Sequence, residues 1–528
     1  MSSQPVRRSL QSRMSNHKSI NNIISGFVGQ IITIALGIII PRLVLLNIGS
    51  EANGLLSTVT QIFTYFALLE AGVGNAALQA LYGPIGAQNT DQTNRILAAT
   101  QLYYKRTGVL YLAGVLVVGF LFPLAVHSSL PYQTVFLVTI LGGLGGVVRY
   151  FTQAKYLMLI KADGRNYAET NISTIINILI SVTKIILLCA GCSVVAIQAM
   201  YFGYSVLTSF VYVTYVRKSY PWLNLRVKPD LQALSKRNSA FIHQISAMIF
   251  NSTDMLVLSL FENLKIVSVY GLYTLLFNMV STAIGTINGS IQYLLGQSFC
   301  NKQREAYLCM HDAFEIYNMV LVFSLYCVAG IFILPFLNLY TAGVEDISYI
   351  DPILPYLFIA VYLLNNGRES SNMLIKFAGH FKQTQWHSVL EAVINITVSL
   401  IGVHFYGIYG VLIGTIAALL YRTNDMIIYA SKKILNRSPW KTYRRWLVNL
   451  ALFIALTVLS KPVFAHIALD TYPRIILWAA ITCVVVIPLF FVVASIFDKE
   501  TYRYTKELAD PYLNRAWSKL KRCARVQK

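Results

Sequence analysis

The feature that most constrains the fold is a succession of apolar stretches that occupies nearly the whole of the 528-residue chain. A hydrocarbon core of about 30 Å is crossed by roughly 20 apolar residues in a helix, whose backbone polar groups are satisfied within the segment. Hydrophobic residues make up 56% of the chain and charged residues only 12%. The sequence therefore predicts an all-α polytopic membrane protein rather than a soluble globular one.

Fourteen apolar windows of suitable length are bounded by charged or turn residues. They run over 20–46, 53–80, 107–127, 133–157, 168–190, 193–216, 239–261, 267–297, 312–340, 352–378, 387–405, 408–431, 446–468 and 474–497. The first is too long for a secretory signal peptide, so we expect it to be retained as a transmembrane helix. We therefore expect about 14 transmembrane helices.

The formal net charge of +21 is concentrated in alternate loops. Lysine and arginine crowd 217–238 and 432–445, whereas the loops "NIGSEAN" and "GVEDISYID" are acidic. By the positive-inside rule, this asymmetry and an even helix count place both termini in the cytoplasm. The charge is thus explained by membrane topology, and nucleic acid is not expected as a partner.

The seven cysteines fall in apolar windows or on the basic side of the chain. Such positions predict neither disulfides nor a metal cage. The single CxxC motif, "CAGC" at 189–192, lacks the second pair that a structural zinc site needs. No metal and no cofactor are therefore expected.

The chain contains an internal repeat. "MLIKADGRNYAETNISTIINILISV" begins at Met158 and "MLIKFAGHFKQTQWHSVLEAVINITVSLI" at Met373, 215 positions later. A second pair of similar stretches places Gly54 and Gly271 217 positions apart. The repeat predicts two pseudo-symmetric six-helix lobes related by an axis along the membrane normal, an arrangement typical of transporters with a central site.

The repeat also sets the expected domain organisation. The segments are a cytoplasmic N-terminal tail (1–18), an N-lobe with helices 1–6 (19–216), a basic cytoplasmic interlobe linker (217–238), a C-lobe with helices 7–12 (239–432), a basic loop with a terminal helix pair (433–497) and a basic cytoplasmic tail (498–528). The terminal pair has no counterpart in the repeat.

Several stretches carry a family resemblance: "LGIIIPRLVLLNIGSEANGLLSTVTQIFTYFALLEAGVGNAALQALYGPI", the turns "KADGRNYAET" and "KFAGHFKQTQ", and "YGIYGVLIGTIAALLYR". Over about residues 19–432 the pattern resembles the multidrug/oligosaccharidyl-lipid/polysaccharide (MOP) exporter superfamily, and within it the bacterial Wzx-type flippases of polysaccharide biosynthesis. The resemblance implies two six-helix bundles in a MATE-like V shape. The terminal helix pair resembles one in the lipid II flippases, where such helices line a groove for the lipid tail.

The resemblance also implies a function without bond making, so an enzyme is not expected. A polyprenyl-diphosphate-linked oligosaccharide would pass from the inner to the outer leaflet of the bacterial cytoplasmic membrane by alternating access. Na⁺ or H⁺ would be the coupling ion. The product would serve surface polysaccharides such as O-antigen, lipopolysaccharide or exopolysaccharide. Membrane lipids, a polysaccharide polymerase and other assembly proteins are the further partners implied.

Ionisable residues inside the apolar windows are the best candidates for a substrate site. A charged residue at mid-helix costs about 2.5–3.5 kcal/mol on insertion scales, so it normally faces a bundle interior or a wet cavity. Arg149 and Arg368 lie at similar depths in helices 4 and 10, 219 positions apart. Two guanidinium groups suit a diphosphate through bidentate hydrogen bonds. The predicted substrate-binding set is Arg149, Arg368, Arg422, Arg42, Asn365, Asn372 and Lys184.

Each of these assignments has a structural alternative. Arg42 and Lys184 lie near helix ends, where they could extend to the interface. Arg368 and Glu369 point about 100° apart on a helix and cannot pair well, so each needs its own partner. Asn365, Arg368 and Asn372 share a helix face suited to sugar hydroxyls. Glu369 is more suited to an interhelix pair or a switch.

A second set of residues is predicted for ion coupling or gating. The family resemblance alone implies a cation site, formed by Asp254, Glu391, Asn395 and Thr415. Oxygen ligands suit Na⁺, and a lone carboxylate suits a proton. Interhelical hydrogen bonding is the alternative. The full predicted set is Asp254, Glu391, Asn395, Thr415, Glu70, Glu369 and Asp425.

Two other functions compete with the flippase. A multidrug/cation antiporter of the same superfamily favours a cavity dominated by acids and aromatics, whereas several intramembrane arginines favour an anionic cargo. A membrane-embedded polysaccharide polymerase or ligase needs a catalytic loop on the outer face. The predicted outer loops are short, roughly a dozen residues or fewer, and hold no acid/base cluster.

Overall fold

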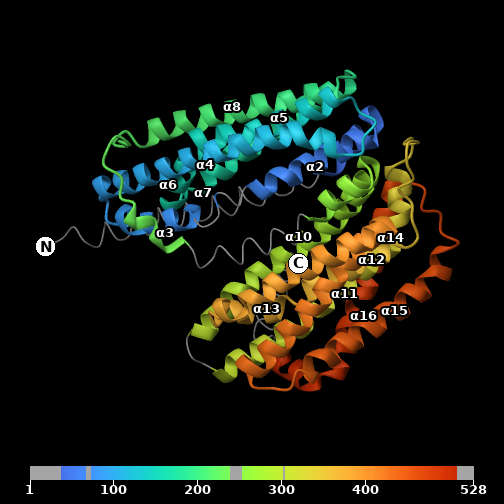
Figure 1. The fold of residues 1–528 in the computed structure, drawn as a ribbon. Coiled ribbons are helices and arrows are strands. Elements are labelled where there is room, and N and C mark those ends of the chain that lie inside the picture. Colours follow the sequence, from blue (N-terminus) through green and yellow to red (C-terminus); the bar gives the residue numbers. More distant parts are fainter. Residues whose placement is uncertain (1–36, 67–69, 71–72, 238–252, 301–303, 508–528) are drawn as a thin grey trace, which may run out of the picture. The chain divides into compact units, whose positions relative to one another are not determined.

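The structure, a computed structural model, describes residues 37–66, 70, 73–237, 253–300 and 304–507 (Figure 1). Every regular element within these ranges is helical, which confirms the all-α fold class. The predicted N-terminal tail, the starts of the first and seventh helices and residues 508–528 of the C-terminal tail lie outside the described ranges.

The contacts within the chain form two compact units. Unit 1 holds the described residues up to Leu272, together with Gly343–Ser348 and Ser399–Val411. Unit 2 holds Tyr273–Ala342, Tyr349–Val398 and the chain from Leu412 onward. Each unit contains most of one predicted lobe, and the terminal helix pair belongs to unit 2.

Unit 1 is built around a central helix. Its elements are α2 (Ser50–Phe66), α3 (Val73–Gly86), α4 (Thr90–Ala125), α5 (Tyr132–Thr152), α6 (Ala154–Ala162), α7 (Asn166–Cys189), α8 (Val194–Ser219) and the 3₁₀ helix η2 (Gln232–Arg237). Helix α5 packs between α4 and α8 (Figure 1). Tyr104, Tyr111, Tyr150 and Tyr212 lie in its buried core. The end of the predicted linker, η2, packs against α3 and so belongs to this unit.

Unit 2 is built around α11. Its elements are most of α10 (Leu264–Cys300), α11 (Arg304–Tyr340), α12 (Leu354–Gly367), α13 (Glu369–Phe377), α14 (Phe381–Tyr429) apart from Ser399–Val411, the π-helical turn η3 (Ala430–Leu435), α15 (Trp440–Phe464) and α16 (Tyr472–Phe497). Helix α11 packs against both α15 and α16, so the terminal hairpin is attached directly to the central helix of the unit (Figure 1). Stacked rings of Tyr273, Phe277 and Phe358 join α10 to α12.

Nine helices in the described ranges are long and apolar enough to cross a membrane, against about 14 predicted. Three causes account for the difference. The starts of two predicted spans are not described, the predicted spans 53–80 and 352–378 are divided into helices too short to be counted, and 387–405 and 408–431 are counted once because α14 runs through a kink at Gly407. Most of the apolar windows coincide with helices that are long and apolar enough to cross a membrane, but a window does not show where its helix is interrupted.

The fourth helix of each predicted repeat is broken. Helices α5 and α6 meet at Gln153, where ψ is −27°, and α12 and α13 meet at Arg368, where ψ is −3°. Both ψ values lie above the usual helical −42°. The two breaks are 215 positions apart, the same offset as the MLIK motifs. The counterpart of Arg368 is therefore Gln153, and the predicted match of Arg368 with Arg149 is wrong by about one helical turn.

The predicted boundary between helices 11 and 12 is a glycine kink inside α14. Gly407 has φ 54° and ψ −129°, a backbone conformation that residues with a Cβ rarely adopt. The kink folds the two halves of α14 so closely together that a Cβ built on Gly410 would lie 2.0 Å from the carbonyl oxygen of Gly402. The turn thus depends on glycine at more than one position.

Within unit 1, α2 also crosses the first turns of α10 at short range. A Cβ on Gly54 would lie 1.7 Å from the carbonyl oxygen of Leu264, and the Asn53 side-chain amide donates to Ser268 Oγ at 2.8 Å. The repeat-related Gly271 faces Ser57 of α2. The two glycines that revealed the repeat in the sequence therefore lie at the same helix crossing.

We predict that Gly410→Ala destabilises the protein by about 1 to 3 kcal/mol, because the new methyl group meets backbone rather than a movable side chain. The measurement is the free energy of unfolding of the purified protein in detergent. Gly203→Ala is the matched control, since a Cβ at Gly203 of α8 meets nothing within 4 Å. Equal effects of the two substitutions would contradict the prediction.

Candidate functional site

The helix break at Arg368 forms one side of a charged cluster in unit 2. Arg368 Nη1 lies 2.7 Å from Glu391 Oε1 of α14, and its Nη2 donates to Asn365 Oδ1 at 3.0 Å. The side chains of Arg368 and Glu391 are only 12% and 10% exposed. A buried ion pair therefore joins the broken helix to the first half of α14.

The second half of α14 supplies the other arginine. Arg422 Nε lies 3.5 Å from Glu391 Oε2, and its Nη1 forms an ion pair with Asp425. Its Nη2 donates to Ser388 Oγ at 3.1 Å. His387 Nδ1 in turn lies 3.0 Å from Asp425 Oδ1. Glu391 is thus shared by two arginines that come from different helices.

The cluster brings together residues that the sequence had assigned to separate roles. Arg368, Arg422 and Asn365 were predicted to bind substrate, whereas Glu391 and Asp425 were predicted to couple ions. In the structure the two acids neutralise the two arginines, with Arg422 almost fully buried. Any substrate anion bound by these arginines has to compete with Glu391 and Asp425. Nothing in the sequence indicated that His387 lies at the edge of this cluster.

Glu369 faces a different set of partners. It accepts a hydrogen bond from Asn372 Nδ2 at 2.8 Å and lies 3.7 Å from Lys376 Nζ. Arg368 and Glu369 therefore do take separate partners. Asn372 pairs with Glu369 rather than extending the polar face of Asn365 and Arg368.

The four residues of the predicted cation site are divided between the units. Asn395 Nδ2 donates to Thr415 Oγ1 at 2.9 Å, and both residues are buried in unit 2. Asp254 belongs to unit 1, where it accepts a hydrogen bond from Tyr270 at 2.7 Å. Glu391 is engaged by the arginines. Among the described residues, no group of three or more His, Cys, Asp or Glu could hold a metal ion.

The corresponding region of unit 1 is built from tyrosines, one acid and one arginine. Tyr104 donates to Glu70 Oε1 at 2.8 Å and stacks on Tyr150. Arg149 lies in the last turn of α5, is exposed, and has no ion-pair partner among the residues that the structure describes. The helix-break residue Gln153 is buried, and its Oε1 has no hydrogen-bond partner in the described part of the chain.

The remaining two cations differ in their surroundings. Lys184 of α7 is buried, and its ammonium nitrogen lies 5.4 Å from the ring centroid of Tyr201 in α8. This cation–π contact replaces the predicted extension of Lys184 to the interface. Arg42 lies half-buried in the helix over 37–48 of unit 1.

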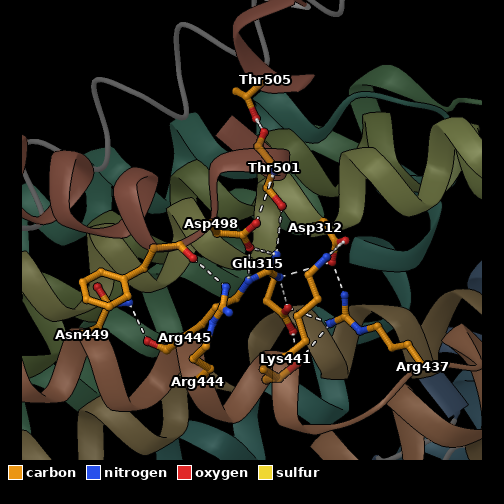
Figure 2. Close-up of polar contacts among 12 residues, drawn as sticks. Asp312, Glu315, Arg437, Lys441, Arg444, Arg445, Asn449, Asp498, Thr501 and Thr505 are labelled. Atoms are coloured by element: carbon orange, nitrogen blue, oxygen red, sulfur yellow. Dashed lines mark hydrogen bonds and ion pairs between the residues drawn. The ribbon is translucent and has the colours of Figure 1, made fainter. Parts of the chain in front are cut away.

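A second charged cluster in unit 2 was not predicted as a site (Figure 2). Arg437 forms ion pairs with Asp312 and Glu315, and Lys441 Nζ lies 2.7 Å from Asp312 Oδ2. The buried Arg445 forms ion pairs with Glu315 and, at 2.5 Å, with Asp498. Three acids and three cations thus fasten α11, α15 and the end of α16 together.

We call this group of three acids and three cations at the base of unit 2 the base cluster; its members are Asp312, Glu315, Arg437, Lys441, Arg445 and Asp498. Because its charges balance, the base cluster has a structural role. Asp498 follows the last residue of α16. Burial alone would raise the pKa of its carboxyl, but the charge and hydrogen bonds of Arg445 hold that pKa below its ordinary value. The spacing of Asp312 and Glu315, and of Lys441 and Arg445, places each pair on one helix face, a signal that the sequence did carry.

Comparison with known proteins connects this architecture to transporters. No protein-family model and no curated protein sequence matches the chain. Among solved structures, the lipid II flippase MurJ in an inward closed conformation matches with a TM-score of 0.65 and 13% identity, over 90% of this chain and 99% of that chain. The chain has the fold of MOP-superfamily transporters.

Two multidrug transporters support the same conclusion about the MOP fold. An inward-facing multidrug resistance MATE family transporter of the MOP superfamily matches with a TM-score of 0.62 and 16% identity, over 79% of this chain and 98% of that chain. The MATE multidrug transporter DinF-BH matches with a TM-score of 0.56 and 17% identity, over 78% of this chain and 94% of that chain. The predicted all-α membrane protein with a MATE-like fold is therefore confirmed at the level of the fold.

We predict strong energetic coupling between Arg368 and Glu391 in this MOP fold. Arg368→Gln and Glu391→Gln should each destabilise the protein, because each leaves a buried charge without its partner. The double variant should lose about 1 to 3 kcal/mol less than the sum of the two single losses. The measurement is a double-mutant cycle of unfolding free energies in detergent.

The control cycle uses the exposed pair Arg474 and Asp470, which are four residues apart near the start of α16. No measurable coupling is expected there, because solvent screens the pair. Additive losses at Arg368 and Glu391 would show that the buried ion pair does not hold the cluster together.

The base cluster predicts a pH-dependent stability. Because the pKa of Asp498 is lowered on folding, its ion pair stabilises the protein above the unfolded pKa of about 3.9, and this stability is lost as the pH falls through the lower folded value. Asp498→Asn should therefore destabilise at pH 7 by about 3 kcal/mol, and the difference from the parent should narrow below about pH 4.

Unfolding temperatures of the parent and the Asp498→Asn variant across pH 3 to 7 measure this effect. Glu507→Gln is the control, because the pair of Glu507 with Arg503 is exposed and contributes little. A difference between Asp498→Asn and the parent that stays constant over the whole pH range would rule out the ion pair as its source.

Proposed function

We propose that this protein is a flippase that moves a polyprenyl-diphosphate-linked oligosaccharide from the inner to the outer leaflet of a bacterial cytoplasmic membrane. Alternating access carries the head group across, no bond is made or broken, and both termini lie in the cytoplasm. The product serves surface polysaccharide biosynthesis. The fold of MOP transporters and the arginines within its apolar helices support this proposal.

The extent of the likeness to MurJ is the observation that carries the proposal. A match over 90% of 528 residues is longer than the 439 residues that precede the terminal hairpin, and we take it to extend into that hairpin. The MATE matches over 78% and 79% of the chain do not require it. In our proposal the hairpin α15–α16 is a feature that this chain has in common with the solved lipid II flippase.

The region of Arg149 and the region of Arg368 and Arg422 would bind a diphosphate in different ways. Arg149 is exposed and has no ion-pair partner in the described ranges, so its guanidinium is available to an anion without breaking a contact. Arg368 and Arg422 are held by Glu391. In our proposal the substrate diphosphate displaces this carboxylate from the two guanidinium groups.

The competing function is drug/cation antiport, which the likeness to MATE transporters suggests. A cationic cargo requires acids that are not already neutralised. Glu391 and Asp425 are both paired with arginine in unit 2. The cluster as a whole therefore has no excess negative charge, and we favour the anionic cargo.

The proposal predicts that deletion of this protein causes lipid-linked repeat units to accumulate on the cytoplasmic face of the membrane. Complementation with Arg149→Ala should restore delivery to the outer leaflet poorly, about tenfold or more below the parent, because a charge-assisted contact to the diphosphate is lost. The measurement is the outer-leaflet fraction of labelled lipid-linked oligosaccharide. Arg149→Lys, which keeps the charge but not the bidentate geometry, should give an intermediate rate.

Arg149 is preferred to Arg368 for this test, because Arg368→Ala also breaks the ion pair with Glu391 and affects folding. Arg474→Ala is the control for removal of one arginine from an exposed site. Normal outer-leaflet delivery in the deletion strain would exclude the flippase function. Full activity of Arg149→Ala would exclude only the role of that residue, and resistance to cationic drugs conferred by the protein would favour the antiporter.

A further inference from the structure

A cavity of about 520 Å³ opens beside the base cluster, where α15 begins and α16 ends. The residues of its lining that carry the argument are Ser438, Trp440, Arg444, Phe497, Lys499 and Glu500. The cavity also contacts Lys441 and Asp498 of the base cluster, which are already paired with Asp312 and Arg445. The charges available to a ligand are therefore those of the other lining residues.

The available charge in this cavity is positive on balance. Arg444 and Lys499 are exposed cations, and Glu500 is the one other acid among the lining residues. Arg444 Nη2 donates to the carbonyl oxygen of Phe497, the last residue of α16, at 2.6 Å. This hydrogen bond fixes the guanidinium at the rim of the cavity. Its other N–H donors have no protein partner in the described part of the chain and remain available to an anion.

The rim of the cavity is apolar as well as basic. Trp440 is 63% exposed, and Ile496 and Phe497 are 57% and 55% exposed. These side chains lie at the ends of two membrane-crossing helices, the level at which tryptophan accumulates between head groups and hydrocarbon. The nearby π-helical turn η3 carries exposed lysines at 432 and 433. A dense group of cations on this end of the hairpin is typical of the cytoplasmic side.

We infer that this cavity binds the phosphate of an anionic phospholipid from the cytoplasmic leaflet. The guanidinium of Arg444 is suited to bidentate hydrogen bonds with phosphate oxygens, and the ammonium of Lys499 supplies a second positive charge. The hydroxyl of Ser438 is a further donor in the lining. Basic pockets beside transmembrane helices recognise lipid head groups in this way.

The apolar rim distinguishes a lipid from a free phosphate ion. A soluble anion gains nothing from Trp440, Ile496 and Phe497, whereas the glycerol backbone and first acyl carbons of a phospholipid would cover them. The site lies beside the base cluster that fastens the hairpin to α11. A lipid bound there bridges the start of α15 and the end of α16 and should stabilise that attachment.

The test uses the full-length protein in zwitterionic detergent with lipid added at known concentration. Native mass spectrometry and the unfolding temperature are recorded with phosphatidylcholine, phosphatidylglycerol or inorganic phosphate as the probe. We expect bound phosphatidylglycerol and a higher unfolding temperature with phosphatidylglycerol only. In Arg444→Gln/Lys499→Gln the affinity for phosphatidylglycerol should fall about fivefold for each cation, or about 30-fold for both.

The matched control is Lys433→Gln/Arg503→Gln, which removes the same charge from exposed positions outside the cavity. It should bind phosphatidylglycerol as the parent does. Lys499→Gln alone leaves the hydrogen bond of Arg444 to Phe497 in place, in case the loss of Arg444 impairs folding. Equal losses of affinity for phosphatidylglycerol in the control and the cavity variant would show that general surface charge causes the binding. That result would overturn the proposed site. Stabilisation by inorganic phosphate equal to that by phosphatidylglycerol would overturn the lipid assignment.

Discussion

A buried arginine must be neutralised, and in this chain that requirement fixes how the helices of unit 2 meet. Arg422 is only 3% exposed and lies between Glu391 and Asp425, while Glu391 also holds Arg368 at the helix break. Removing any one of these charges leaves another uncompensated in a medium of low dielectric constant. The same rule operates at the base of the unit, where Arg445 connects α11 to the end of α16. Two separate ion-pair clusters thus determine the position of α12, α14 and the terminal hairpin.

The sequence predicted those parts of the fold that depend on local hydrophobicity and on repetition. Apolar windows located the spans because insertion into lipid depends on the side chains of one segment. The repeat predicted two lobes, and its 215-residue offset reappears in the breaks at Gln153 and Arg368. The breaks themselves were not predicted, because the polar residues near Gln153 and Arg368 were interpreted as a substrate site within continuous helices and not as marks of an interruption.

Partnerships across helices were beyond what the sequence could predict. Arg368 and Glu391 are 23 positions apart and lie on different helices, so their contact depends on packing and not on spacing. The sequence could show only that Arg368 and Glu369, being adjacent, need separate partners. The base cluster is an instructive exception. Asp312 and Glu315 form an acidic face on α11, and Lys441 and Arg445 form a basic face on α15. Complementary faces of this kind are visible in a sequence once two helices are suspected to be neighbours.

The two broken helices have the same geometry but different chemistry, and this difference bears on transport. In unit 1 the break carries the uncharged Gln153, and the nearby Arg149 is exposed with no ion-pair partner among the described residues. In unit 2 the break carries Arg368 itself, already neutralised by Glu391. Under the proposed function, the first arrangement can meet an anionic head group directly, whereas the second can do so only when the carboxylate gives way. Under that function, Arg149 makes the first contact with the substrate, and Arg368 binds it only after exchange with Glu391. Pseudo-symmetry of the backbone would then serve two unequal tasks.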